Sequence, residues 1–287
     1  LQAIPAGGTQ RPAIPELDPV AKPDWVGVAL TGSAAELKRL LDGGMDANSS
    51  TEAGTTALML AARDPEKVKL LLDRGADPNA RSAIGFTALM VAARIRDNTR
   101  SVRLLLDRDA KTNAEKGVEV RHDASALFFA ATSGDTQTMK MLLDAGANPN
   151  KPMKLLGFLG TTPINYAVAS GDGATVELLL AHGADANELD ENGISLLGWA
   201  AISNSVRPLE SLLARGAKVN HVDKLGMTPL LYAASIDFGD TTVINKLIAA
   251  GADLNARSKE GLTAVDLARN YQHLRMMSLL ATRVSAK

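Results

Sequence analysis

Apolar residues in this chain form short runs that come in pairs. The first run of a pair follows a Thr or Ser, as in residues 56–62, and the second follows after a short polar stretch, as in residues 68–72. Apolar residues spaced three and four positions apart predict amphipathic helices. The Thr or Ser predicts an N-cap, because its hydroxyl can accept hydrogen bonds from the free N–H groups of a first helical turn. Each pair of runs therefore predicts two short helices.

The predicted helix pairs repeat along the chain. The phrase Leu-Leu-x-x-Gly-Ala-Asp-x-Asn, with some substitutions, returns seven times, with its Asn at positions 48, 79, 113, 150, 187, 220 and 255. Its Gly stands where a helix C-terminus favours a left-handed residue, and Asp109 replaces that Gly at the third junction. A period of 31 to 37 residues predicts a solenoid, in which each unit contacts only its neighbours.

This phrase and Thr/Ser-x-apolar-x-x-Ala recur in fixed phase and together resemble the ankyrin repeat over residues 23–287. The resemblance implies an all-α solenoid of stacked antiparallel helix pairs, with β-hairpin-like loops that project between units. It also implies about eight repeats, including atypical capping repeats at both ends. The phrases look similar to those of bacterial ankyrin proteins. One departure is the His that follows Leu in the ankyrin pattern, whose place is taken by Met59, Met90, Phe128, Asn165, Gly198, Leu231 and Asp266.

The first 22 residues differ from the rest of the chain. They are rich in Pro and Gly and show no helical period. We expect residues 1–22 to form an extended N-terminal tail or linker, followed by a repeat domain over residues 23–287. The chain begins at Leu1 rather than Met. This indicates a processed or truncated N-terminus and leaves the compartment, cytoplasmic or exported, undecided.

Composition and charge exclude several classes of function. The net charge is −1, from 31 basic and 32 acidic residues, so the sequence has no electrostatic footprint for nucleic acid. No apolar run reaches the ~18 residues that a membrane-spanning helix needs. The chain has no cysteine, which excludes disulfides, thiol catalysis and cysteine-based zinc sites. Aromatic residues make up 3% of the chain, so Leu and Ala must fill the core.

The sequence contains no arrangement typical of catalysis or of a cofactor. Its four histidines, His122, His182, His221 and His273, lie in different repeats and form no metal-binding motif. We expect His182 to cap a helix C-terminus. The Asp residues of the repeated phrase lie a whole repeat apart and are interpreted as turn carboxylates rather than calcium ligands. We therefore predict a protein that is not an enzyme and that has no cofactor or metal.

An aromatic column falls at one phase of the repeat, at Phe129, Tyr166, Trp199 and Tyr232. It could form a stacking platform for bases or sugars, but Leu60, Val91 and Leu267 stand at the same phase in other units. We therefore interpret the column as part of the core between repeats.

The loops between units differ in length. From Asn to the next Thr or Ser the distance is 8 residues in five units, but 12 at 113→125 and at 150→162. The second long loop, residues 151–160, is rich in large apolar side chains, which in an exposed loop indicate an interaction site. Alternatively, this loop packs on its long neighbour and buries Val118 and Val120 with it.

The sequence favours a non-catalytic protein–protein interaction module. We expect it to bind a protein or peptide through its concave face and its two long central loops. The candidate partner-binding residues are Ile84, Phe86, Met153, Leu155, Leu156, Phe158, Leu159, Ile194, Leu225 and Met227. The alternative for these side chains is that they pack hairpin against hairpin. Two other functions stay open: a permanent structural or accessory subunit of a larger complex, and a regulatory domain of a larger enzyme.

Overall fold

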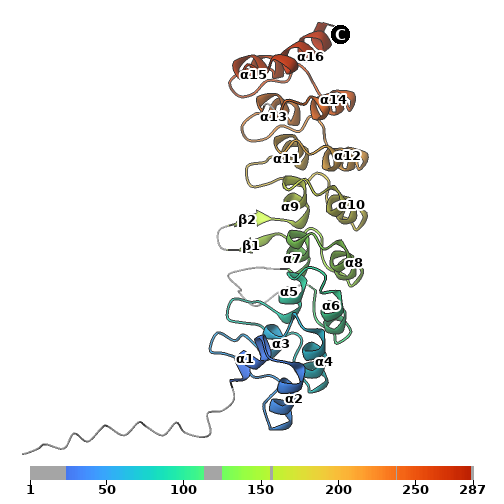
Figure 1. The fold of residues 1–287 in the computed structure, drawn as a ribbon. Helices are drawn as coiled ribbons and strands as arrows, with labels where there is room; N and C mark the ends of the chain where they lie inside the picture. The colour runs from blue at the N-terminus through green and yellow to red at the C-terminus, as the bar shows by residue number, and fades with distance from the viewer. Residues whose placement is uncertain (1–23, 113–124, 156–157, 237, 286–287) are drawn as a thin grey trace, which may run out of the picture.

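The computed structural model describes residues 24–112, 125–155, 158–236 and 238–285. Within these ranges the helices stack in pairs along one axis (Figure 1). The odd-numbered helices form an inner column, the even-numbered helices form an outer column, and loops project from the inner column away from the outer helices (Figure 1). The prediction of an all-α solenoid is confirmed.

The inner helices are α1 (Trp25–Leu30), α3 (Ala57–Leu60), α5 (Ala88–Ala93), α7 (Ala126–Ser133), α9 (Pro163–Ala169), α11 (Leu196–Ile202), α13 (Pro229–Ser235) and α15 (Ala264–Asn270). The outer helices are α2 (Ala34–Asp42), α4 (Pro65–Asp73), α6 (Thr99–Leu106), α8 (Thr136–Asp144), α10 (Gly173–Ala181), α12 (Val206–Ala214), α14 (Thr242–Ala249) and α16 (Leu274–Ser285). Two strands, β1 (Met153–Leu155) and β2 (Phe158–Thr161), form an antiparallel hairpin before α9.

The Thr and Ser residues before the inner helices act as N-caps, as the sequence predicts. At α3 the Thr56 hydroxyl accepts a hydrogen bond from the backbone N–H of Met59 at 3.2 Å. The same contact is made at six further inner helices, by Thr87, Ser125, Thr162, Ser195, Thr228 and Thr263. Each hydroxyl thereby satisfies a donor that the first turn leaves unpaired.

Alanine and leucine form one continuous core between the two columns. Leu37, Leu71, Leu105, Leu142 and Leu179, all from outer helices, are completely buried. Pairs of alanines, such as Ala61 and Ala62 after α3, are buried where the inner helices approach their neighbours. Small side chains at these positions allow the thin layers to stack closely, which agrees with the low aromatic content of the chain.

Several of the repeated Asn residues bind their own repeat to the next one. The Asn79 side-chain amide donates to the carbonyl of Asp109 at 3.1 Å, and its oxygen accepts from the N–H of Lys111 at 2.8 Å. The same two bonds join Asn48, Asn150 and Asn220 to the turn one repeat later. The Asn side chain therefore satisfies both a free carbonyl and a free N–H of the neighbouring turn, which explains its recurrence.

The Asp residues of the same phrase shape their own turns. At Asp46, Asp77, Asp185 and Asp253 a carboxylate oxygen accepts from the N–H of the Asn two residues later, at 2.8–2.9 Å. This is the contact of an Asx turn. It supports the interpretation of these residues as structural carboxylates.

Six outer helices are followed by a glycine with a left-handed backbone, and Asp109, which stands at the same position after α6, has the same conformation. These glycines are Gly44, Gly75, Gly146, Gly183, Gly216 and Gly251. Gly75, for example, has φ +84°, and Asp109 has φ +61°. A side chain is strained in this region. We expect Asp109→Gly to raise the free energy of unfolding by about 0.5–1 kcal/mol. Urea denaturation tests this prediction, with Asp107→Gly as the control, because Asp107 has φ −64° and Gly should not stabilise there. A lower denaturation midpoint for Asp109→Gly would contradict the argument.

The loops that project from the inner column stack on one another. The N–H of Ala83 donates to the carbonyl of Ala53 at 2.8 Å, and the N–H of Lys224 donates to the carbonyl of Asn192 at 3.3 Å. The second long loop forms the β1–β2 hairpin, in which Met153 pairs with Thr161 and Leu155 with Phe158. The first long loop, with Val118 and Val120, lies outside the described residues.

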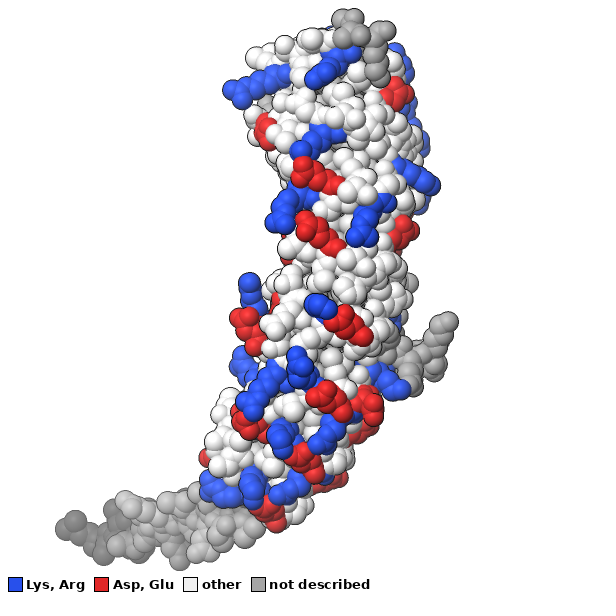
Figure 2. All heavy atoms as spheres, turned by 90° about the vertical axis from the view of Figure 1, so that its right-hand side faces the viewer, with Lys and Arg blue, Asp and Glu red and all other residues white. Residues whose placement is uncertain are grey.

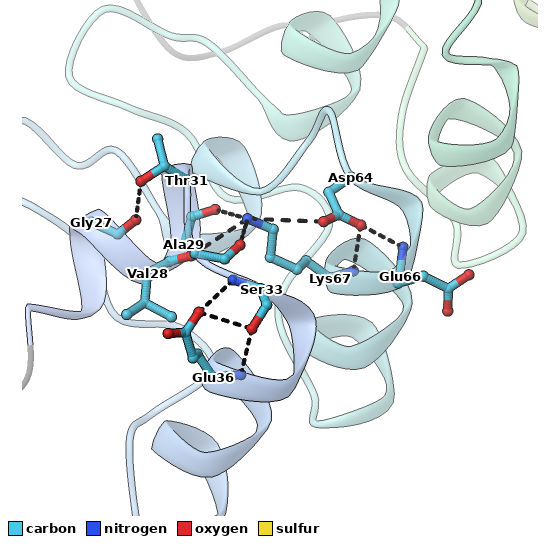
Figure 3. Close-up of polar contacts among 10 residues, drawn as sticks. Gly27, Val28, Ala29, Thr31, Ser33, Glu36, Asp64, Glu66 and Lys67 are labelled. Atoms are coloured by element: carbon cyan, nitrogen blue, oxygen red, sulfur yellow. Dashed lines mark hydrogen bonds and ion pairs between the residues drawn. The ribbon is translucent and has the colours of Figure 1, made fainter.

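A buried lysine joins the first two repeats (Figure 3). Lys67, near the start of α4, has a relative exposure of 2%. Its Nζ donates to the carbonyls of Ala29 at 2.8 Å, Gly32 at 2.9 Å and Val28 at 3.4 Å, all at the C-terminal end of α1. The negative end of the α1 dipole and its free carbonyls thus receive a positive charge.

The outer face carries closely mixed positive and negative charges (Figure 2). Ion pairs connect successive outer helices, such as Arg74 with Asp42 and Arg108 with Asp73. Hydrogen bonds from Lys38 and Arg74 hold the pKa of the Asp42 carboxyl below its usual value. Pairs of this kind on a solvated surface contribute little to stability individually, and they leave the outer face without a dominant charge.

Candidate functional site

An apolar cavity lies on the inner face, between the inner helices and the hairpin loops at the N-terminal end of the stack. It has a volume of about 440 Å³, within the range of about 300–1,000 Å³ that is common for ligand sites. We call it the inner-face groove. Its lining residues are Leu30, Ala53, Thr55, Met59, Leu60, Arg63, Ser82, Ala83, Ile84, Phe86, Val91 and Ile95.

Helix periodicity explains why the groove is apolar. In α3, Leu58 is turned into the core, whereas Leu60 lies on the inner face and lines the groove. Leu30 of α1 and Val91 of α5 line it from the neighbouring helices. From the hairpin side Ile84 reaches the same cavity. Apolar side chains from the inner helices α1, α3 and α5 thus form the floor, and a hairpin forms the wall.

Two side chains in the groove are unusually exposed for their size. Leu30 has a relative exposure of 47% and Ile84 of 56%. They lie together with the partly buried Leu60, Phe86 and Val91, which pack against the core. Single exposed apolar residues are ordinary on protein surfaces, but a contiguous apolar cavity is typical of a binding site.

Aromatic rings continue the inner face toward the C-terminal end. The rings of Phe86 and Phe129 lie 5.3 Å apart, and those of Phe128 and Tyr166 lie 5.9 Å apart. The interpretation of the aromatic column as core holds for Phe129, which is buried, and is wrong for Tyr166, which is exposed. Tyr166 stands four residues after the capping Thr162. Leu60 and Val91 stand at the same position of their repeats and line the inner-face groove, so this position of the short inner helices is only partly covered.

Two hairpin carboxylates hold the last rings of this column. Asp190 accepts from the indole Nε1–H of Trp199 at 3.1 Å, and Asp223 accepts from the hydroxyl of Tyr232. Asp223 also accepts from the N–H groups of Leu225 and Met227, both at 2.8 Å. Burial and the Asp223 carboxylate raise the pKa of the Tyr232 hydroxyl. These rings are thus fixed to their hairpins, and their polar groups are satisfied within the chain.

The family model of ankyrin repeats (3 copies) matches the chain in overlapping segments over residues 27–116, 63–153, 127–223, 164–257 and 197–287. The chain belongs to the ankyrin-repeat family. Ankyrin repeats are generally protein–protein interaction modules and are typically non-catalytic. None of the curated proteins compared with the chain matches it.

The candidate partner-binding residues fall into four groups in this ankyrin array. Ile84 and Phe86 line the inner-face groove. Leu225 is exposed, but on a hairpin near the other end of the stack. Met153 and Ile194 are buried, and Met227 packs against the core, so these three fit the alternative of packing within the chain. Leu155, Phe158 and Leu159 belong to the strands β1 and β2, but their side chains lie outside the described part of the structure. Leu156 lies outside it entirely.

Of the residues that line the groove, only Ile84 and Phe86 are among the candidates from the sequence. Those that the sequence did not indicate include the apolar Leu30, Leu60, Val91 and Ile95. Leu60 and Val91 stand at the same phase as the aromatic column, four residues after the capping Thr. The sequence therefore contained the signal, but an apolar side chain at a helical phase is ordinarily assigned to the core. Side chains at this position of the short inner helices stay partly exposed, because the hairpins cover only part of the inner face.

The histidines described by the structure all bind backbone carbonyls. His182 contacts the carbonyl of Leu178 at 2.9 Å, which confirms its place at a helix C-terminus. His221 contacts the carbonyl of Gly193 and His273 that of Ala234; His122 lies outside the described residues. Among the residues that the structure describes, no group of three or more His, Asp or Glu could hold a metal ion. The helices in the same ranges include none with the length and apolar character to cross a membrane.

Proposed function

We propose that the protein binds a protein or peptide partner, without catalysis, through the concave inner face and mainly in the inner-face groove. The observation that carries this proposal is the apolar cavity of about 440 Å³, into which the half-exposed Leu30 and Ile84 project. The β1–β2 hairpin projects on the same side of the stack (Figure 1) and can extend the contact.

The physical basis is the burial of apolar surface by a few anchors. Removing apolar area from water contributes roughly 25 cal/mol per Å². Interfaces usually gain most of their affinity from a small central cluster surrounded by a polar rim. Leu30, Leu60 and Ile84 provide such a centre, and the hairpin backbone at Ala53 and Ala83 is already paired, so binding requires little reorganisation of the groove.

A charge placed in the groove tests the proposal. We expect Ile84→Asp to abolish capture of the partner from an extract of the native source, measured by affinity purification and mass spectrometry. The melting temperature should change little, because the Ile84 side chain is 56% exposed. Val222→Asp is the matched control, since Val222 has the same exposure of 56% and also lies in a hairpin. Proteins that Val222→Asp retains and Ile84→Asp loses would support binding in the inner-face groove. Equal retention by both variants would contradict it.

A further inference from the structure

The inner-face groove is bordered by arginines. Arg63 is the single charged residue among the described residues that line it. Arg94 stands at the same position one repeat later, directly after an Ala-Ala pair. Arg81 and Arg96 adjoin the lining residues Ser82 and Ile95 in the sequence. Arg63 thus lines the apolar cavity, and three further arginines belong to the segments that line it or to the next repeat.

In the part of the chain that the structure describes, these four arginines have no side-chain partner. Within the described ranges, no side-chain hydrogen bond or ion pair is formed by Arg63, Arg81, Arg94 or Arg96, and three of them are exposed. The outer-face arginines Arg74, Arg100 and Arg108, by contrast, all form ion pairs with an acidic residue of the preceding outer helix. Three outer-face arginines are therefore paired with carboxylates, whereas Arg39 and Arg103 of the outer helices are not, in the ranges that the structure describes. Among the described residues, none of the four arginines in or near the groove is paired.

Acidic groups near the groove do not balance this charge. Asp64 is occupied, because it accepts from the N–H groups of Glu66 and Lys67 and lies 4.0 Å from the Lys67 ammonium. Two other acidic residues remain. Glu52 precedes the lining residue Ala53, and Asp97 follows the lining residue Ile95 by two positions. Four arginines against two carboxylates leave a local positive excess in a chain whose net charge is −1.

Resting on the proposed function, we infer that the partner segment is acidic and amphipathic. Its apolar side chains fill the groove, and its Asp or Glu residues contact the arginines at the border. Arginine suits this role because its planar guanidinium can bind a carboxylate through two parallel hydrogen bonds. Complementary charge around an apolar centre increases the association rate and selects the correct partner. A single nucleic-acid strand is a poorer fit, because bases need several stacking surfaces and phosphates need a continuous basic track. Among the described residues, the groove lining offers one aromatic ring, Phe86, and one basic residue, Arg63.

The inference is tested with a random peptide library displayed on phage and selected on the immobilised full chain. We expect enriched peptides to combine Leu, Ile or Phe with Asp and Glu, and to be lost on Ile84→Asp. Enrichment of neutral or basic peptides that still depend on Ile84 would overturn the acidic partner and leave the proposed function standing. If no enriched peptide distinguishes the wild type from Ile84→Asp, both the inference and the proposed function fail.

Charge reversal gives the quantitative test. For a selected acidic peptide, we expect Arg63→Glu combined with Arg94→Glu to weaken binding at least about tenfold in fluorescence polarisation. The matched control combines Arg39→Glu and Arg103→Glu, which change the net charge equally but lie on the outer helices α2 and α6. Equal loss in both double variants would mean that only overall charge matters and would contradict the inference. The inference would also be contradicted if a labelled oligo-dT strand bound tightly through these arginines and if Ile84→Asp did not weaken that binding.

Discussion

Replacing Lys67 by Met is expected to lower the free energy of unfolding of the N-terminal repeats by about 2–4 kcal/mol. The side chain is 2% exposed, and its Nζ is the only described partner of the carbonyls of Ala29 and Gly32 beyond the helix itself. Met has a similar length but no donor. The variant would therefore leave buried carbonyls at the end of α1 without a partner, and Asp64 without its nearest positive charge.

The two tryptophans of the chain allow this loss to be located. Trp25 is the first residue of α1, the helix whose C-terminal carbonyls Lys67 binds, and Trp199 lies in α11. Because each unit of a solenoid contacts only its neighbours, destabilisation at one end need not unfold the other. In a Trp199→Phe background, the Trp25 fluorescence in urea should report an earlier transition for Lys67→Met.

Lys69→Met is the matched control for this experiment. Lys69 lies two residues further along α4, is largely exposed and pairs with Asp73 at 2.6 Å. A pair of this kind on a helix surface contributes about 0.3–0.5 kcal/mol. If Lys67→Met destabilises the protein no more than Lys69→Met, the buried ammonium does not hold the first two repeats together.

The second large effect is expected at the Asn residues that join consecutive repeats. We expect Asn220→Ala to lower the free energy of unfolding by about 1–2 kcal/mol, because it removes two hydrogen bonds, each contributing about 0.5–1.5 kcal/mol. The Asn220 amide donates to the carbonyl of Gly251 at 3.0 Å and accepts from the N–H of Asp253 at 2.8 Å. Chemical denaturation followed by circular dichroism measures the change.

The chain contains a natural control for this substitution. Asn255 stands at the same position one repeat later, where the last repeat lacks the Gly-Ala-Asp turn, and its side-chain amide makes no bond among the described residues. We expect Asn255→Ala to change stability by less than about 0.5 kcal/mol. Similar losses for both substitutions would show that the bonds between turns are not the cause.

Much of the fold could be predicted because its signals are local and repeated. The Thr and Ser N-caps, the glycines with positive φ and the left-handed Asp109 each follow from one residue and its position in the unit. The paired helices follow from apolar spacing. Seven copies of one phrase make each of these assignments reliable, since an accidental match does not recur in phase.

Other features could not be read from the sequence, because they depend on how neighbouring repeats meet. Lys67 lies in an outer helix, where a lysine is ordinarily exposed; its burial arises because the end of α1 presents carbonyls directly beside it. Met153 and Ile194 belong to loops in the sequence but are buried in the structure. The exposure of Leu30 and Ile84 likewise depends on the packing of hairpins on inner helices, which residue spacing does not report.

The most direct measurement of the proposed binding site is the methyl NMR spectrum of the full chain, labelled at Ile, Leu and Val, with and without a selected peptide or the purified partner. We expect changes at Ile84, Ile95, Leu30 and Leu60, which line the inner-face groove, and none at Ile248 on the outer helix α14. Changes confined to α14, or to the C-terminal hairpins around Val222 and Leu225, would contradict binding in the groove.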